Sequence, residues 1–295
     1  MEKITPRVDL AFKKIFGVEE NKDLLISLIN SIVTQEDQVK EVTLLNPYNP
    51  KNFKKDKLSI LDIKATGESG KRFNIEIQIT DEADYDKRAL YYWAKLYTEQ
   101  LKTAEDYASL EKAIGIHILN FTSIPEVKKY HNVFNIVEKE SGLKYFKDLE
   151  LHTIELKKFT GQADEKLNDL VGKIKTSLDI WAAFLTRHEL LNKDALPKEL
   201  NDSSLRKALT VLEVMNFNAE EREAYEGHLK WLMIEANTLR KYEQKGFAEG
   251  RAEGIAQVAI NLLKKGMSIA DIAEATNLSI DEINKIASSS TLAEN

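Results

Sequence analysis

Two stretches in the first third of the chain alternate strictly between apolar and polar residues. Residues 61–65 are Leu-Asp-Ile-Lys-Ala, and residues 74–79 are Asn-Ile-Glu-Ile-Gln-Ile. A period of two is typical of strands that are buried on one face. Because Gly67 and Gly70 lie between the two stretches, the pattern predicts a β-hairpin over about residues 58–80.

The alternation also predicts which side chains share a face of this hairpin. Asp62 and Lys64 lie on one face of the first strand, and Glu76 and Gln78 lie on one face of the second. We expect the two faces to coincide, which would bring Asp62 and Glu76 together. Two carboxylates on adjacent strands suit Mg²⁺, which keeps water and substrate phosphate as its other ligands. The alternative is a polar stripe of an edge hairpin that faces solvent.

A helix is predicted before the hairpin. Thr5 and Pro6 suit its N-cap and first helical position, and Gly17 suits its end. Helical spacing places Asp9 on the same face as Phe12, which must point into the core. An acid on the buried side is costly without a partner, so Asp9 is a candidate functional residue.

The rest of the first 160 residues alternates between strand and helix patterns. Further strands are predicted at 39–46, 113–121, 131–138 and 149–156, and helices at 21–33 and 84–107. The 113–121 segment is nearly all apolar and β-branched, which is typical of a central strand covered on both faces. A helix between a hairpin and a further strand indicates the α/β class, with a mixed sheet and helices packed on it.

After Phe159 the pattern is helical, with predicted helices at 163–191, 203–215 and 219–244. Glycines at 246, 250 and 254 then either permit close approach of another helix or mark a flexible hinge. Three short helices over 255–287 resemble a helix-turn-helix module, with a core that includes Ile269 and Ile272. The module is not basic, so we favour protein contact over DNA reading.

These patterns divide the chain into three parts. An α/β domain is predicted at 1–160, a helical region at 161–245, and a glycine-spaced linker helix with the helix-turn-helix-like module at 246–295.

Composition narrows the possible functions. The chain has 295 residues, a net charge of −6, no cysteine, and five histidines without close spacing. Cysteine zinc sites, thiol catalysis and disulfides are excluded, and a histidine zinc centre is disfavoured. Any nucleic-acid binding must come from a local patch, because the total charge is acidic. The sequence has neither the apolar core of a signal peptide nor an apolar run of about 20 residues, so we expect a cytoplasmic protein without membrane contact.

Four blocks of sequence together resemble a known family. In chain order they are Asp9-Leu-Ala-Phe-Lys-Lys-Ile-Phe-Gly17, Leu61-Asp-Ile-Lys-Ala65, Asn74-Ile-Glu-Ile-Gln-Ile79 and Arg88-Ala-Leu-Tyr-Tyr-Trp-Ala-Lys-Leu-Tyr97. They are similar to blocks of the Rpn family, which comprises recombination-promoting nucleases, also described as transposases, of the PD-(D/E)XK nuclease superfamily. The blocks cover roughly the first 100 residues, and the helical remainder matches more loosely.

The resemblance implies a fold, an activity and a cofactor. The implied fold is a restriction-endonuclease-like mixed sheet flanked by helices, followed by an all-helical C-terminal region. The implied activity is cleavage of DNA that depends on Mg²⁺ or Mn²⁺, and the nuclease-like domain would be residues 1–160.

The resemblance also assigns site residues. Asp62 matches the aspartate of the family motif and Glu76 its second acid, so both would bind the metal. Gln78 stands where the superfamily has lysine; this departure is usual in the Rpn branch, and it leaves Gln78 able to orient water or phosphate by hydrogen bonds alone. Lys64, on the same strand face as Asp62, is our own candidate to supply part of the positive charge that a lysine at position 78 would have given. Asp9 matches an acid of the first helix and would assist near the metal, or would instead be a rim acid that binds Lys13 or a backbone amide.

Basic and aromatic residues near the acids are candidate DNA contacts. Arg88, Tyr91 and Lys95 form one stripe of the predicted 84–107 helix, and Lys64 lies beside Asp62. Such side chains contact phosphate oxygens in protein–DNA complexes. The alternative is a packed aromatic helix with solvated basic residues. Lysines at 51, 54, 55 and 57 are further candidates, although a lysine run of this kind is more often a solvated loop.

We therefore predict a metal-dependent DNA endonuclease, linked by its resemblance to recombination, transposition or phage defence. Asp62, Glu76, Gln78 and Asp9 are the predicted catalytic residues. The alternative is a catalytically inactive DNA-binding or regulatory protein that retains the nuclease fold. A homodimer through the C-terminal helices is a further prediction.

Overall fold

The computed structural model describes residues 4–47, 62–82, 84–102, 106–160, 164–215 and 217–291. The chain divides into two compact units, Met1–His228 and Leu229–Asn295. The predicted lysine arm at 51–57 lies outside the described residues. Within the described ranges, no helix combines the length and the apolar character that crossing a membrane requires.

Six strands in the described part of the first unit form one mixed sheet, in the order β1-β2-β3-β4-β6-β5. They are β1 (Val42–Leu44), β2 (Asp62–Gly67), β3 (Arg72–Gln78), β4 (Ala113–Leu119), β5 (His131–Phe134) and β6 (Leu149–Glu155). β1, β2 and β3 are antiparallel neighbours, β3, β4 and β6 run parallel, and β5 pairs antiparallel with β6. The predicted mixed sheet is confirmed, and β4 is buried along its whole length, as expected for a central strand.

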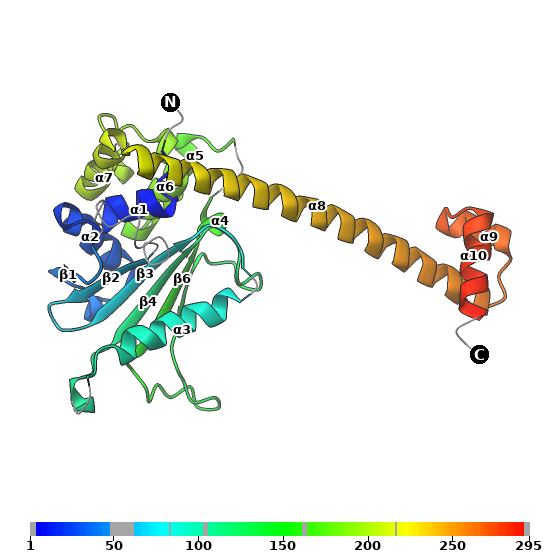
Figure 1. Ribbon diagram of the computed structural model, residues 1–295, viewed down its shortest axis with the longest axis horizontal. Helices are drawn as coiled ribbons and strands as arrows, with labels where there is room; N and C mark the ends of the chain where they lie inside the picture. Colours follow the sequence, from blue (N-terminus) through cyan, green and yellow to red (C-terminus); the bar gives the residue numbers. More distant parts are fainter. Residues whose placement is uncertain are drawn as a thin grey trace. The chain divides into compact units, whose positions relative to one another are not determined.

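Helices cover both faces of this sheet (Figure 1). α3 lies across one face against β3 and β4, and α1, α2, α6 and α7 lie on the other side. The helices of the first unit are α1 (Asp9–Phe16), α2 (Lys22–Ile32), α3 (Tyr85–Thr98), α4 (Leu156–Phe159), α5 (Leu167–Val171), α6 (Ser177–Arg187) and α7 (Ser203–Val214). Short 3₁₀ helices are η1 (Glu19–Asn21), η2 (Gln35–Asp37), η4 (Tyr107–Ser109), η5 (His188–Leu190) and η6 (Lys198–Leu200).

The main core lies between the sheet and the four-helix side. Ile63 and Ile75 of the hairpin pack there with Phe12 of α1, and each is fully buried. Phe184 of α6 and Leu209 of α7 belong to the same core. The alternation therefore puts the apolar residues of the hairpin into this core and directs the polar residues towards α3.

The first, third and fourth predicted helices differ from the structure. The helix predicted at 84–107 is α3, which ends at Thr98. α1 begins at Asp9 with Val8 as its N-cap, so Thr5 and Pro6 are not its start. Thr5 instead closes a turn in which the Val8 amide donates to its carbonyl at 3.3 Å. The predicted 163–191 helix is two helices, α5 and α6, because Gly172 ends one and a capping box at Thr176 starts the next.

The second unit contains the rest of α8 (Ala219–Lys264), together with α9 (Ile269–Thr276) and α10 (Ile280–Thr291). The glycine-spaced segment is part of α8, and a Cβ at any of its three glycines would meet nothing within 4 Å. Gly266 ends this stretch with a φ of +78°, a conformation that glycine adopts without strain. Ile272 and Ile283 form the small core with Ala259, whereas Ile269, predicted to be in that core, is 37% exposed.

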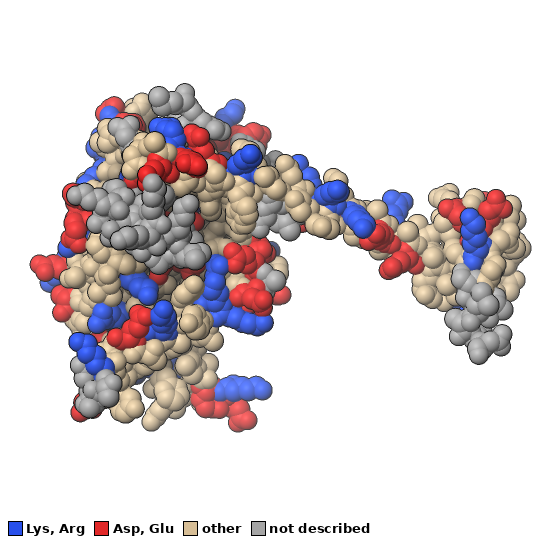
Figure 2. Space-filling model, in the orientation of Figure 1, with Lys and Arg blue, Asp and Glu red and all other residues tan. Residues whose placement is uncertain are grey.

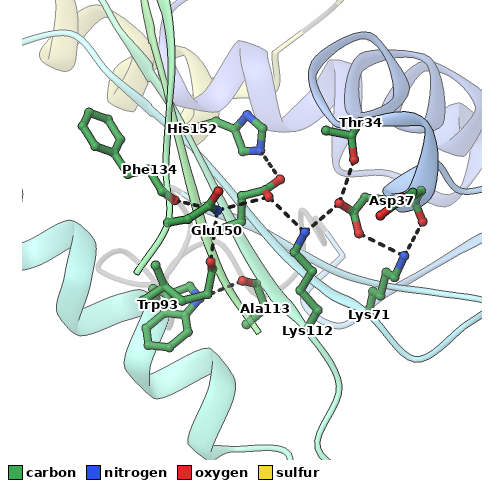
Figure 3. A network of polar contacts seen from close by, with 12 residues as sticks. Thr34, Asp37, Lys71, Trp93, Lys112, Ala113, Phe134, Glu150 and His152 are labelled. Atoms are coloured by element: carbon green, nitrogen blue, oxygen red, sulfur yellow. Dashed lines mark hydrogen bonds and ion pairs between the residues drawn. The ribbon is translucent and has the colours of Figure 1, made fainter. Parts of the chain in front are cut away.

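A network of buried charges joins the beginnings of the three parallel strands (Figure 3). Lys112, just before β4, donates to Asp37 at 2.6 Å and to Glu150 at 3.0 Å. Lys71, just before β3, lies 3.0 Å from the second oxygen of Asp37, and His152 Nε2 donates to Glu150 at 2.9 Å. We call these five residues the lysine network.

Candidate functional site

The hairpin register brings the predicted acids together. Asp62 of β2 lies directly opposite Glu76 of β3, and Glu76 lies next to His117 of β4. Paired residues of neighbouring strands point to the same face of a sheet. Asp62, Glu76 and His117 therefore form a row across three strands, on the face that α3 covers, and the predicted coincidence of the two hairpin faces is confirmed.

Glu76 is held in a poorly compensated environment. The residue is 6% exposed, and Arg88 Nη2 donates to its Oε1 at 3.3 Å. Its Oε2 is buried and accepts no hydrogen bond. Burial raises the pKa of Glu76 to about 7, with Arg88 opposing the shift and Asp62 adding to it. A buried oxygen without a donor, beside a second carboxylate, is suited to a cation.

Asp9 is the first residue of α1 and lies close enough to Glu76 to repel it. The residue is 7% exposed. Burial, and then the charge of Glu76, raises the pKa of Asp9 to about 7. Excess negative charge thus accumulates where α1 meets the hairpin. We call Asp9, Asp62 and Glu76 the carboxylate cluster.

Backbone contacts fix the position of Asp62. Lys13 Nζ donates to the Asp62 carbonyl at 2.7 Å, and Asn46 Nδ2 donates to the same oxygen at 3.1 Å. Asn46 Oδ1 in turn accepts from the Lys64 amide at 2.7 Å. Lys13 from α1 and Asn46 after β1 therefore clamp the start of β2, and Asn46 Nδ2 also donates to the Asp62 carboxylate at 3.4 Å.

Gln78, the last residue of β3, connects the cluster to α3. Its Oε1 accepts from Arg88 Nη2 at 2.6 Å, and its Nε2 donates to Glu82 at 3.0 Å. Arg88 Nη1 donates to the other oxygen of Glu82 at 2.6 Å. The guanidinium also lies over the ring of Tyr85, 5.2 Å from the centroid. Arg88 is thus part of the site and not a solvated residue of α3.

Two residues of the site were not predicted from the sequence, His117 and Tyr85. The Tyr85 hydroxyl and His117 Nδ1 are 2.8 Å apart, and the same nitrogen is 3.8 Å from Glu76 Oε2. Burial lowers the pKa of His117 to about 4 and raises that of Tyr85, so both are neutral at neutral pH. A histidine in the middle of the otherwise apolar 113–121 segment was the available signal.

The other predicted DNA contacts lie apart from the carboxylates. Lys64 and Lys95 both pair with Glu99, at 3.6 and 3.7 Å. Tyr91 projects from α3 and is 63% exposed. Figure 2 shows basic and acidic side chains interspersed among the described residues on this face of the first unit. Lys64 therefore faces Glu99, away from the place of the missing lysine charge.

The donor set limits which metal could bind. Among the described residues, no group of three or more histidine, aspartate and glutamate side chains is arranged to hold a metal ion. Mg²⁺ needs fewer protein ligands, since one or two carboxylates suffice when water and phosphate complete the octahedron. Asp62 and Glu76 could supply those one or two carboxylates.

Comparison with known proteins agrees with this arrangement. The family model described as PD-(D/E)XK nuclease family transposase matches residues 6–241. The match covers the whole sheet, the carboxylate cluster and α3. Searches of curated proteins and of solved structures found no significant match.

Proposed function

The chain belongs to the PD-(D/E)XK nuclease family transposases, and from that premise we propose that it is a metal-dependent DNA endonuclease. The observation that carries the proposal is the pairing of Asp62 with Glu76 on adjacent strands, with one Glu76 oxygen buried and without a donor. If Glu76 were only a structural acid, we would expect hydrogen-bond donors for both of its carboxylate oxygens.

Asp62 and Glu76 are the proposed ligands of Mg²⁺ or Mn²⁺. The raised pKa of Glu76 supports this assignment, because a divalent cation would offset the cost of burying its charge and the repulsion from Asp62 that together raise it. When bound, the ion would polarise the scissile phosphate and lower the pKa of an attacking water. Its two charges would also balance the excess of acids in the cluster.

Asp9 and Gln78 are proposed to assist the two ligands. The pKa of Asp9 responds to the charge of Glu76, which supports a carboxylate near the ion that acts through water. Gln78 has no charge, so it can orient a water or a phosphate by hydrogen bonds only. Arg88 lies in the site itself, whereas Lys64, Lys95 and Tyr91 would meet more distant phosphates of the duplex.

A specific observation favours the second candidate function, a catalytically inactive DNA-binding or regulatory protein. Gln78 stands where the superfamily has a lysine, so the site lacks that charge at that position. Such a protein would retain DNA in a gel shift and would not cleave it, whichever divalent metal is added.

The test is cleavage of a supercoiled plasmid with Mg²⁺ or Mn²⁺. We expect nicked or linear product from the wild type, and at least a 100-fold lower rate from Asp62→Asn and Glu76→Gln, on the order of the loss on removing a catalytic donor. Asp84→Asn is the matched control, since Asp84 is an exposed acid paired with Lys87. Cleavage at the wild-type rate by either site variant would refute the assignment.

A homodimer through the C-terminal helices is the proposed assembly. α8 exposes Met233, Ile234, Tyr242 and Phe247, and its glycines leave space for a second helix. Exposed apolar side chains along a helix favour a partner. Sedimentation velocity of Phe247→Glu should show a monomer where the wild type and the control Lys241→Glu show a dimer; a monomeric wild type would contradict the proposal.

A further inference from the structure

Three groups surround the Arg88 guanidinium and fix its position at the edge of the carboxylate cluster. It contacts Glu76 at 3.3 Å, Gln78 at 2.6 Å and Glu82 at 2.6 Å, and it lies over the Tyr85 ring. The Arg88 side chain is 30% exposed, so a ligand in solvent can reach it. A guanidinium held in this way is already oriented to bind an anion.

Glu82 occupies this anion position in the structure. One of its oxygens accepts from Gln78 Nε2 at 3.0 Å and the other from Arg88 Nη1 at 2.6 Å. The amide of Gln78 and the guanidinium of Arg88 therefore offer one N–H donor each to the two oxygens of one anion, and two oxygens of a phosphate could take the same two donors. The carboxylate of Glu82 is 45% exposed, so it can leave without opening the core.

Two lysines near the described site contact groups other than Gln78. Lys13 is 3% exposed, and its ammonium donates to the Asp62 carbonyl. Lys64 pairs with Glu99 at 3.6 Å. Arg88 is therefore the accessible charge beside Gln78, the position at which the resemblance leads one to expect a lysine.

We propose that Arg88 and the Gln78 amide form the clamp for the scissile phosphate, and that Glu82 fills this clamp until DNA displaces it. The proposal rests on the proposed nuclease function. Arg88 would neither give nor take a proton; it would stabilise the negative charge that grows on the phosphate oxygens during hydrolysis. Glu82 would act as an internal competitor that weakens binding of DNA lacking a well-placed phosphate.

Two measurements on five variants test the clamp. The first is the Kd for a short fluorescent duplex, by anisotropy, in Ca²⁺ in place of Mg²⁺. We expect Arg88→Met to weaken binding about 10-fold, as loss of a charge-assisted pair, and Glu82→Gln to tighten it about 5-fold. The controls are Lys87→Met and Asp84→Asn, an exposed pair on the same helix turn, which should change the Kd less than about 2-fold.

The second measurement is the single-turnover cleavage rate at saturating DNA and Mg²⁺. The rate of Arg88→Met should fall about 100-fold, and Arg88→Lys should retain part of the rate because an ammonium keeps the charge without the fork. Thermal melting of each variant by circular dichroism confirms folding, and Arg88→Lys carries the test if Arg88→Met does not fold.

The outcomes separate this inference from the nuclease proposal. Wild-type cleavage together with an unimpaired Arg88→Met, or a Glu82→Gln that binds DNA no more tightly than Asp84→Asn, overturns the clamp alone. If the wild type fails to cleave DNA with every metal tested but the variants show the expected order of Kd values, the nuclease function is overturned and a phosphate clamp remains. Cleavage by the wild type that is lost in Arg88→Met, together with the expected order of Kd values, supports both the nuclease function and the clamp.

Discussion

The sheet of the first unit has two clusters of buried charge, one at each end of its parallel strands. The lysine network lies where β3, β4 and β6 begin, and the carboxylate cluster lies towards the ends of β3 and β4. In the network, Lys112 lies between two acids and every acid has a cation or a histidine donor (Figure 3). In the cluster, a Glu76 oxygen has no donor at all.

The pKa values record this difference. In the network, the hydrogen bond from His152, against the cost of burial, lowers the pKa of Glu150 to about 2. In the cluster, burial raises the pKa of Glu76 and Asp9 to about 7. Both clusters are buried, so burial alone does not distinguish a structural ion network from a functional site. The missing hydrogen-bond donor at Glu76 is what distinguishes the two clusters. Selection for stability alone would favour a donor for that oxygen or an apolar residue in place of the acid.

The largest expected effect comes from neutralising one acid in each cluster. Glu76→Gln should lower the cleavage rate at least 100-fold while raising the free energy of unfolding by roughly 1–3 kcal/mol at pH 8, because it removes a charge whose pKa the fold raises. Glu150→Gln should do the opposite, with cleavage near the wild-type rate and a loss of roughly 2–3 kcal/mol. Urea denaturation and the plasmid assay measure both.

Equal behaviour of these two variants would break the comparison. A Glu76→Gln protein that is both inactive and less stable would mean that Glu76 is an ordinary structural acid whose loss disturbs the fold. An active and more stable Glu76→Gln protein would instead remove Glu76 from the site.

The faces of the hairpin were predictable because strand alternation is a local property. A period of two placed Ile63 and Ile75 in the core, so Asp62 and Glu76 had to share the other face. Gln78 and the first-helix acid Asp9 followed from the same local patterns.

Long-range contacts were not predictable in this way. The 84–107 pattern put Arg88 on a stripe with Tyr91 and Lys95, but its contact with Gln78 depends on how the loop after β3 turns. The lysine network depends on the alignment of parallel strands that are far apart in the chain, since Lys71, Lys112 and Glu150 each precede or begin a different strand. Single-sequence periodicity carries no information on that alignment.

The second largest effect should come from the central cation of the network. Lys112→Met removes the ammonium shared by Asp37 and Glu150 and leaves both acids partly buried without it. We expect a loss of roughly 2–3 kcal/mol, below the about 3–5 kcal/mol of a fully buried pair because the Lys112 side chain is 18% exposed. Urea denaturation at pH 7 measures the loss, and cleavage at the wild-type rate confirms that the two clusters are independent; a 10-fold slower variant would show that they are coupled.

A smaller effect concerns pH and His131, whose Nε2 lies 2.9 Å from His152 Nδ1 at the edge of the network. Burial, and then the neighbouring His152, lowers the pKa of His131 to about 4 from 6.5. The unfolded chain therefore binds more protons between these two values, so stability falls as the pH drops from 6.5 to 4. His131→Phe keeps the ring stacked on His152 and removes the titration.

Urea denaturation at pH 7 and near pH 4.5 isolates this contribution. The wild type should lose about 1–2 kcal/mol more than His131→Phe over that interval, after allowance for the partial exposure of His131. The acid Glu150 contributes little over this interval, because its stabilisation is lost as the pH falls from its ordinary pKa of 4.5 to its folded pKa of about 2. Equal losses in the two proteins would show that His131 is not held neutral by the fold.

The smallest effect should come from Lys71, the second cation on Asp37. Lys71→Met removes the cation from one Asp37 oxygen, while the other oxygen keeps the hydrogen bonds from Lys112 at 2.6 Å and from Thr34 at 3.0 Å, so the acid retains one cation. We expect a loss of at most about 1 kcal/mol by urea denaturation. The double variant with Lys112→Met should lose more than the sum of the single variants, because Asp37 then has neither lysine. Additive losses would mean that the network is a set of separate pairs, and the contrast with the carboxylate cluster would then rest on Glu150 alone.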